Sequence, residues 1–139
     1  MNKVVAVSGG FDPSNRGHIE FLKEAKKLGD KLVVILNKDQ FLLNKKGSVF
    51  MPYEDRREIL KALGFVYDVI PCTDEDDTVK NTLSQLKPNI FAKGPNWKTD
   101  NIPEKEVCKK LGIKIVVNVG KVISSNLNLF ISNIGEKNE

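Results

Sequence analysis

The sequence predicts an α/β fold: a Rossmann-like, five-stranded parallel sheet with helices on both faces. Short, continuous apolar runs such as 3–8 and 31–36 are typical of strands that are buried on both faces of a parallel sheet. Segments with helical apolar spacing separate these runs, and alternating strands and helices form parallel sheets. Glycines follow several strands and helices, where turns and helix caps favour them.

The first half of the chain is expected to hold two strands and two helices. A strand over 3–8 precedes a helix over 18–28, whose apolar residues fall on one face. A second strand covers 31–36. The segment 37–50 mixes polar and apolar residues without a regular spacing. It is predicted to be a long, mobile loop, and long loops in compact domains are usually functional. A helix then follows over 51–64, with Pro52 in its first turn and Gly64 at its end.

The second half is expected to complete the sheet. Strands are predicted over 67–71, 88–92 and 113–117. Helices are predicted from the acidic segment 74–77 to Leu86, over 102–111, and after Ser124. We expect one domain over 1–135 and a flexible tail over 136–139.

Composition limits the classes of function. The chain has 139 residues and a formal net charge of +4, and its Lys and Arg residues are scattered. This favours small anionic ligands over nucleic acid. No signal peptide or membrane segment is visible, and Cys72 and Cys108 have no second histidine near them for a zinc site. We therefore expect a cytoplasmic protein with two buried, reduced cysteines, no nucleic-acid partner and no membrane partner.

The stretch 4–18 is the strongest functional signal. A valine-rich strand ends in Gly9 and Gly10, and a helical pattern opens at His18, the only histidine of the chain. A strand followed by glycines and then by a helix N-terminus is typical of a site that binds an anion. The backbone N–H groups point outward there, and the helix dipole favours negative charge.

This stretch resembles the Gly-x-Phe-Asp-x-x-His-x-Gly-His signature of the cytidylyltransferase-like nucleotidyltransferases. Gly9, Gly10, Phe11, Asp12, Gly17 and His18 match in order and spacing, and Asn15 stands where the family has its first histidine. Four further segments resemble family motifs: 38–41 with the basic pair Lys45 and Lys46 after it, 53–57, 91–97 and 123–126. The layout is nearest to glycerol-3-phosphate cytidylyltransferase and heptose-phosphate adenylyltransferase.

The resemblance implies nucleotidyl transfer. CMP would pass from CTP to a small phosphorylated or phosphonylated acceptor, with release of pyrophosphate. Mg²⁺ would be carried by the triphosphate, and no protein metal site is expected. Two alternatives stay open: an adenylyltransferase that uses ATP on a sugar phosphate, and a degenerate protein that binds nucleotide without catalysis. Relatives of this kind are often homodimers, so we expect a homodimer.

The resemblance also implies roles for particular residues. The catalytic candidates are His18, Asn15, Lys45, Lys46 and Arg56. The nucleotide-binding candidates are Gly9, Gly10, Phe11, Asp12, Gly17, Lys93, Gly94, Asn96, Trp97, Ile123, Ser124 and Ser125. Asp39 and Arg56 are expected to bind the acceptor, with Arg56 forking onto its phosphate.

Several positions depart from the family pattern. Asn15 can donate a neutral hydrogen bond to a phosphate but not the charge-assisted bond of an imidazolium. Either Arg16 or Lys93 compensates, or the enzyme is slow, or it no longer catalyses. Asn96 replaces the family's usual Asp, Val122 a frequent Gly, and Asn126 the last hydroxyl of the final motif.

Overall fold

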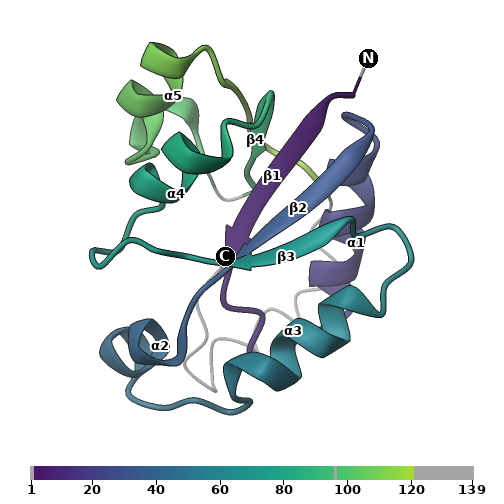
Figure 1. Ribbon diagram of the computed structural model, residues 1–139, viewed down its shortest axis with the longest axis vertical. Helices are drawn as coiled ribbons and strands as arrows, with labels where there is room; N and C mark the ends of the chain where they lie inside the picture. The colour runs from purple at the N-terminus through teal and green to yellow at the C-terminus, as the bar shows by residue number, and fades with distance from the viewer. Residues whose placement is uncertain (1, 96, 121–139) are drawn as a thin grey trace.

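The computed structural model describes residues 2–95 and 97–120, and these form a five-stranded parallel sheet with strand order β3-β2-β1-β4-β5. Figure 1 shows β1 between β2 and β4 near the middle of the sheet. The strands are β1 (Val4–Gly9), β2 (Lys31–Leu36), β3 (Asp68–Pro71), β4 (Ile90–Ala92) and β5 (Lys114–Val116). The predicted fold class is therefore confirmed.

Helices cover both faces of the sheet. They are α1 (Arg16–Lys26), α2 (Asp39–Lys46), α3 (Tyr53–Lys61), α4 (Lys80–Leu86) and α5 (Lys105–Leu111). Figure 1 shows α1 and α3 on one side of the sheet and α4 and α5 on the other, while α2 lies beyond the end of β2. Among the described residues, no helix is both long enough and apolar enough to cross a membrane.

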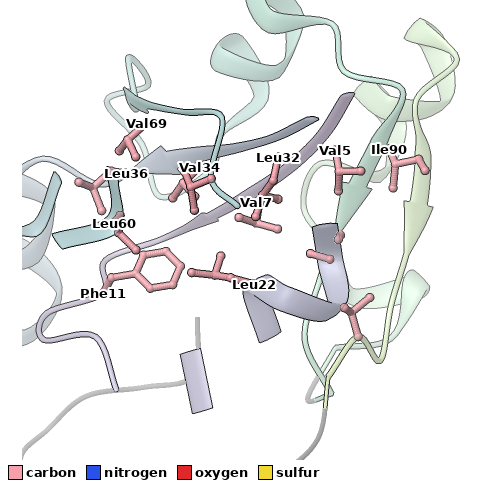
Figure 2. Packing of buried hydrophobic residues seen from close by; sticks show 14 residues of the cluster. Val5, Val7, Phe11, Leu22, Leu32, Val34, Leu36, Leu60, Val69 and Ile90 are labelled. Carbon is pink, nitrogen blue, oxygen red and sulfur yellow. The ribbon is translucent and has the colours of Figure 1, made fainter. Parts of the chain in front are cut away.

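Successive side chains of a strand point to opposite faces of the sheet, and a cluster of buried apolar residues lies on each face. Val5 and Val7 of β1 pack with Leu22 of α1 and Leu60 of α3, and Figure 2 shows Phe11 beside these two helical residues. Ala6, which lies between the two valines, faces α4 and α5 and joins Leu83, Phe91 and Cys108. The period of two in a strand explains why adjacent residues of β1 enter different cores.

The two cysteines are free and buried, as the sequence predicts. Burial raises the pKa of the Cys72 thiol. Burial, together with the charge of Glu104, raises the pKa of the Cys108 thiol to about 11. Both thiols are therefore protonated at neutral pH and behave as small apolar side chains.

The expected long loop over 37–50 is wrong, because its first part is helix α2, Asp39–Lys46. Three consecutive apolar residues, 41–43, hide any helical spacing, and only Leu42 of this helix is buried. End signals identify the helix: Asp39 stands in the first turn, Lys45 and Lys46 stand in the last, and Gly47 ends it with a φ of 80°.

The acidic segment 74–77 also differs from its prediction, since it precedes helix α4 instead of starting it. Asp74 caps that helix: its carboxylate accepts hydrogen bonds from the backbone N–H groups of Asn81 at 2.8 Å and Thr82 at 3.0 Å. The predicted last helix, the domain end at 135 and the tail over 136–139 lie outside the described residues.

Candidate active site

The two glycine loops open onto one crevice, as their places in the sequence predict. β1 and β4 are neighbours in the sheet, and the chain leaves β1 toward β2 on one side while β4 and β5 extend the sheet on the other. Ligands of open α/β sheets bind at the carboxyl ends of the strands, where the strand order reverses in this way. A small hollow, here called the inner chamber, lies there with a volume of about 70 Å³. Its walls include Ser8, Gly9, Asn37, Lys93, Trp97 and Glu104.

A larger hollow, here called the outer cavity, adjoins the inner chamber and has a volume of about 650 Å³. Asn37, Phe41, Lys45 and Asp77 line both hollows. One wall of the outer cavity is helix α2, and the opposite wall is the segment 72–77 after β3. Cationic and carboxylate side chains thus face the same space from different elements.

Arg56 holds the loops of the crevice together from inside the protein. Its side chain is 0% exposed, and Nη1 donates to the carbonyl oxygens of Gly10 at 2.9 Å and Asn37 at 2.7 Å. Nε donates to the carbonyl of Met51 at 2.9 Å. Nη2 donates to Asp39 Oδ1 at 2.7 Å. The geometry therefore gives Arg56 and Asp39 a positioning role, and our expectation that Arg56 forks onto an acceptor phosphate has no support in it.

Asp12 is likewise part of the scaffold of the crevice. Its carboxylate is buried and accepts hydrogen bonds from the backbone N–H groups of Phe50 at 2.7 Å and Met51 at 2.6 Å. Lys46 Nζ lies 3.1 Å from Asp12 Oδ2 and donates to the Asp12 carbonyl at 3.0 Å. Asp12 and Lys46 thus tie the first glycine loop to the segment after α2. Of the pair Lys45 and Lys46, it is Lys45 that lines both hollows.

Phe11 has a structural role that our nucleotide-binding prediction missed. Its side chain is fully buried in the core between the sheet, α1 and α3, and its ring lies edge-on to His18 with the ring centroids 5.0 Å apart. Its φ is 49°, a left-handed conformation that turns the chain sharply after Gly10. The buried ring anchors this turn, so a nucleotide would meet only the backbone of Phe11.

His18 and Asn15 form a capping box at the start of α1. The Asn15 N–H donates to His18 Nδ1 at 3.2 Å, and the His18 N–H donates to Asn15 Oδ1 at 3.1 Å. Because Nδ1 accepts, we assign the proton of the neutral ring to Nε2. Burial lowers the pKa of His18 to about 4, so the ring is neutral at physiological pH.

This cap gives a structural reason for the residue at position 15. Asparagine is among the best N-cap residues, because its side-chain oxygen accepts from an otherwise unpaired backbone N–H of the first turn. Gly17 also stands in that first turn. Asn15 therefore caps helix α1 at the position where the family motif has a histidine.

Lys93 supplies positive charge at the second glycine loop. It follows β4, is 7% exposed, and its Nζ lies 4.2 Å from the ring centroid of Trp97 and 5.3 Å from that of Phe91. The backbone of the loop is held by Gly94, whose carbonyl accepts from Asn118 N–H at 3.2 Å. Lys93 and Trp97 thus line the inner chamber, and the nucleotide-binding role of these two residues and of Gly94 stays a prediction. Asn96, Ile123, Ser124 and Ser125 lie outside the described residues.

The sequence analysis missed two residues of the crevice, Asn37 and Glu104. Asn37 is buried at the end of β2, where its N–H donates to the Gly9 carbonyl at 3.0 Å. Glu104 is 4% exposed and lines the inner chamber. A polar residue directly after a buried strand is a signal that marks Asn37. No local pattern distinguishes Glu104 from the other acids of the chain.

Comparison with known proteins identifies the family. A family described as cytidylyltransferase-like matches residues 6–132 of this chain. The chain belongs to the cytidylyltransferase-like family. FAD synthase from Pyrococcus abyssi is 39% identical over 114 residues, which cover 81% of this chain and 76% of the relative. The bifunctional protein HldE from Cronobacter sakazakii is 37% identical over 119 residues, which cover 84% of this chain and 25% of the relative.

A solved structure agrees with this assignment. The lipopolysaccharide core biosynthesis protein from Thermoplasma volcanium GSS1 superposes with a TM-score of 0.73 and 29% identity, over 88% of this chain and 100% of that one. The cytidylyltransferase-like chain spans about a quarter of the length of HldE, so the similarity concerns one part of that protein. The resemblance inferred from the sequence motifs, to a nucleotidyltransferase of this superfamily, is therefore confirmed.

Proposed function

We propose that this protein transfers an adenylyl group from ATP to the phosphate of a small, polyhydroxylated acceptor. A phosphate oxygen of the acceptor attacks the α-phosphorus, a new P–O bond forms, and the bond to the leaving pyrophosphate breaks. The observation that carries the proposal is the meeting of both glycine loops in one crevice beside Lys45 and Lys93. Such a reaction needs aligned anions and fixed positive charge, without a covalent nucleophile.

The first glycine loop would hold the triphosphate. Gly9 lines the inner chamber, and α1 begins a few residues later, so backbone N–H groups and the helix dipole favour anions there. His18 is proposed to donate one neutral hydrogen bond from Nε2. Asn15 is proposed to donate from its side-chain amide, because its oxygen caps the helix. Arg16, Lys45 and Lys93 then supply the charge that two neutral groups lack.

The sequence motifs favour CTP as the nucleotide, whereas the named relatives favour ATP. The product named in FAD synthase contains an adenosine nucleotide joined through a pyrophosphate to a flavin phosphate. HldE is similar over 84% of this chain, and the sequence motifs resemble heptose-phosphate adenylyltransferase as well. ATP is therefore our first choice of nucleotide, and CTP is the competing arm of the test.

The outer cavity supports a polyhydroxylated acceptor. Lys38 and Lys45 on one wall suit its phosphate, while Glu75 and Asp77 on the other can accept hydrogen bonds from hydroxyl groups. The similarity to a lipopolysaccharide core biosynthesis protein also favours a sugar phosphate. Flavin mononucleotide is the second candidate, because it too carries a phosphate and a polyhydroxylated chain.

Mg²⁺ is proposed to enter on the triphosphate as part of the substrate. No group of three or more His, Cys, Asp or Glu residues within the described ranges is arranged to hold a metal ion. Magnesium keeps much of its water shell and commonly binds through substrate phosphates, which fits this donor set. The homodimer expected from the sequence stays a prediction.

The direct test is pyrophosphate release with ATP or CTP and Mg²⁺. Each nucleotide is paired with glycerol 3-phosphate, hexose and heptose phosphates, and flavin mononucleotide. We expect turnover with ATP and at least one acceptor, and a loss of about 10²-fold in kcat/KM for Lys45→Ala. Lys110→Ala, an exposed change on α5, is the matched control and should leave turnover unchanged. Turnover with CTP alone contradicts the choice of nucleotide.

A second candidate function is nucleotide binding without catalysis. The capping box favours it, because it gives Asn15 a structural role at the start of helix α1 that does not depend on catalysis. Calorimetry that shows nucleotide binding, with no product for any acceptor, supports this alternative. Turnover gained by Asn15→His would instead identify a weakened enzyme.

A further inference from the structure

We propose that Glu104 recognises a ribose hydroxyl of the bound nucleotide and is a specificity-determining residue of the crevice. The inference rests on the proposed nucleotide site and names one of its contacts. It begins with an unusual atom: Glu104 Oε1 is buried and has no hydrogen-bond partner among the described residues. A buried carboxylate oxygen without a donor is costly, so its place in a protein needs an explanation.

The other oxygen of the same carboxylate shows that the side chain is held in place. Glu104 Oε2 accepts a hydrogen bond from the Val79 N–H at 2.9 Å. This bond joins the start of α5 to the residue before α4, and both helices pack on the same face of the sheet. Glu104 thus has one oxygen bound to the scaffold and one oxygen to which no residue of 2–95 or 97–120 donates, in a side chain that is 4% exposed.

The position of Glu104 connects it with the nucleotide. It lines the inner chamber together with Gly9 and Lys93, the residues of the two loops that would hold the phosphates. Its negative charge repels phosphate, and an ionised carboxylate can only accept hydrogen bonds. The ligand group that donates a hydrogen bond to Glu104 must therefore be neutral and lie close to the phosphates.

A ribose hydroxyl meets these conditions best. The sugar is the part of a nucleotide that directly follows the α-phosphate, so it would lie in the inner chamber when the phosphates lie on the first glycine loop. The inner chamber, at about 70 Å³, is large enough for the hydroxyl edge of a sugar, while the outer cavity, at about 650 Å³, has room for a larger part of a ligand.

The test compares nucleotides that differ only in these hydroxyls. Calorimetry with Mg²⁺ measures the Kd of ATP, 2′-deoxy-ATP and 3′-deoxy-ATP for the wild-type protein and for Glu104→Gln. The variant can keep the bond to Val79 through its amide oxygen, and it places an N–H donor where Oε1 was. We expect at least one deoxy analogue to bind tenfold to a hundredfold more weakly than ATP to the wild type. That ratio should fall several-fold in Glu104→Gln, where the hydroxyl can at best accept a neutral hydrogen bond from the amide in place of the charge-assisted bond to the carboxylate.

Glu106→Gln is the matched control, because Glu106 is exposed in the first turn of α5, two residues after Glu104. It should keep the wild-type ratio between ATP and the deoxy analogues. A purely structural role for Glu104 would weaken the binding of ATP and both analogues equally, and that result overturns the proposal. Equal binding of the three nucleotides to the wild type overturns it too, even where the variant does not fold. A higher KM for the acceptor with an unchanged ribose ratio would place Glu104 beside the acceptor instead.

The outcomes separate this inference from the proposed function. Ribose discrimination that depends on Glu104, without turnover for any acceptor, supports the inference and removes the enzymatic proposal. Turnover without ribose discrimination retains the enzymatic proposal and removes the inference. The CTP series is run in the same way, so the choice of base does not affect the conclusion.

Discussion

Arg56→Lys tests whether Arg56 supports the crevice or touches the acceptor. The guanidinium serves four acceptors, and two of them, the carbonyl oxygens of Gly10 and Asn37, are bound within the buried interior. Nη1 donates to both of these carbonyls, and a lysine ammonium ends about one bond short of the Nη1 position on a stem without the planar fork. We therefore expect both buried carbonyls to lose their side-chain donor.

The expected cost follows from these contacts. The loss of a donor to a buried acceptor costs about 1–3 kcal/mol, so the two carbonyls together cost up to about 2–6 kcal/mol. The bond to Asp39 adds little, because that side chain is 43% exposed and water replaces its partner. A loss of about 3 kcal/mol is a large part of the roughly 5–15 kcal/mol that stabilises a domain.

The assay is urea unfolding followed by the fluorescence of Trp97, the only tryptophan of the chain. With a denaturant slope of about 1.5 kcal/mol/M, the midpoint should fall by about 2 M in Arg56→Lys. The neighbouring Arg57→Lys is the control: Arg57 makes one longer hydrogen bond, 3.3 Å to the Val69 carbonyl, and should shift the midpoint much less. An Arg56→Lys protein of wild-type stability with a raised KM for the acceptor would refute the positioning role and restore a direct contact.

Three further predictions concern local structure. Asn15→Ala removes the oxygen that caps α1, so the free energy of unfolding should fall by about 1 kcal/mol, measured by urea unfolding, whereas Asn15→Asp should retain stability. His18, the sole histidine, should titrate by NMR with a pKa of about 4. Because this pKa is lowered from 6.5, stability should fall by up to about 3 kcal/mol as the pH drops from 6.5 to 4, and His18→Gln should abolish the fall. Gly29→Ala would place a Cβ 2.8 Å from Val5 Cγ2 and 2.9 Å from the Lys3 carbonyl, so thermal unfolding should show a loss of about 1–3 kcal/mol.

The sequence determined the sheet and the edge at which the crevice lies. A continuous apolar run such as that of β2 is typical of a strand that is buried on both faces of a parallel sheet. The glycines at the ends of β1 and β4 allow the backbone to approach an anion closely. These are local properties, so they are visible in the order of the residues. The short helix α2 was missed because only Leu42 of its eight residues is buried and its apolar residues show no helical spacing.

Only the tertiary structure decided what the charged residues of the crevice do. Arg56 contacts Gly10 and Asn37, which lie 46 and 19 residues away in the sequence, and these contacts make it part of the scaffold. Glu104 meets Val79 across 25 residues and keeps one oxygen without a described partner. The sequence does not show whether an ionisable residue lies on the surface or in the interior. Burial and partners distinguish the two cases, because both depend on which distant segments the fold brings together.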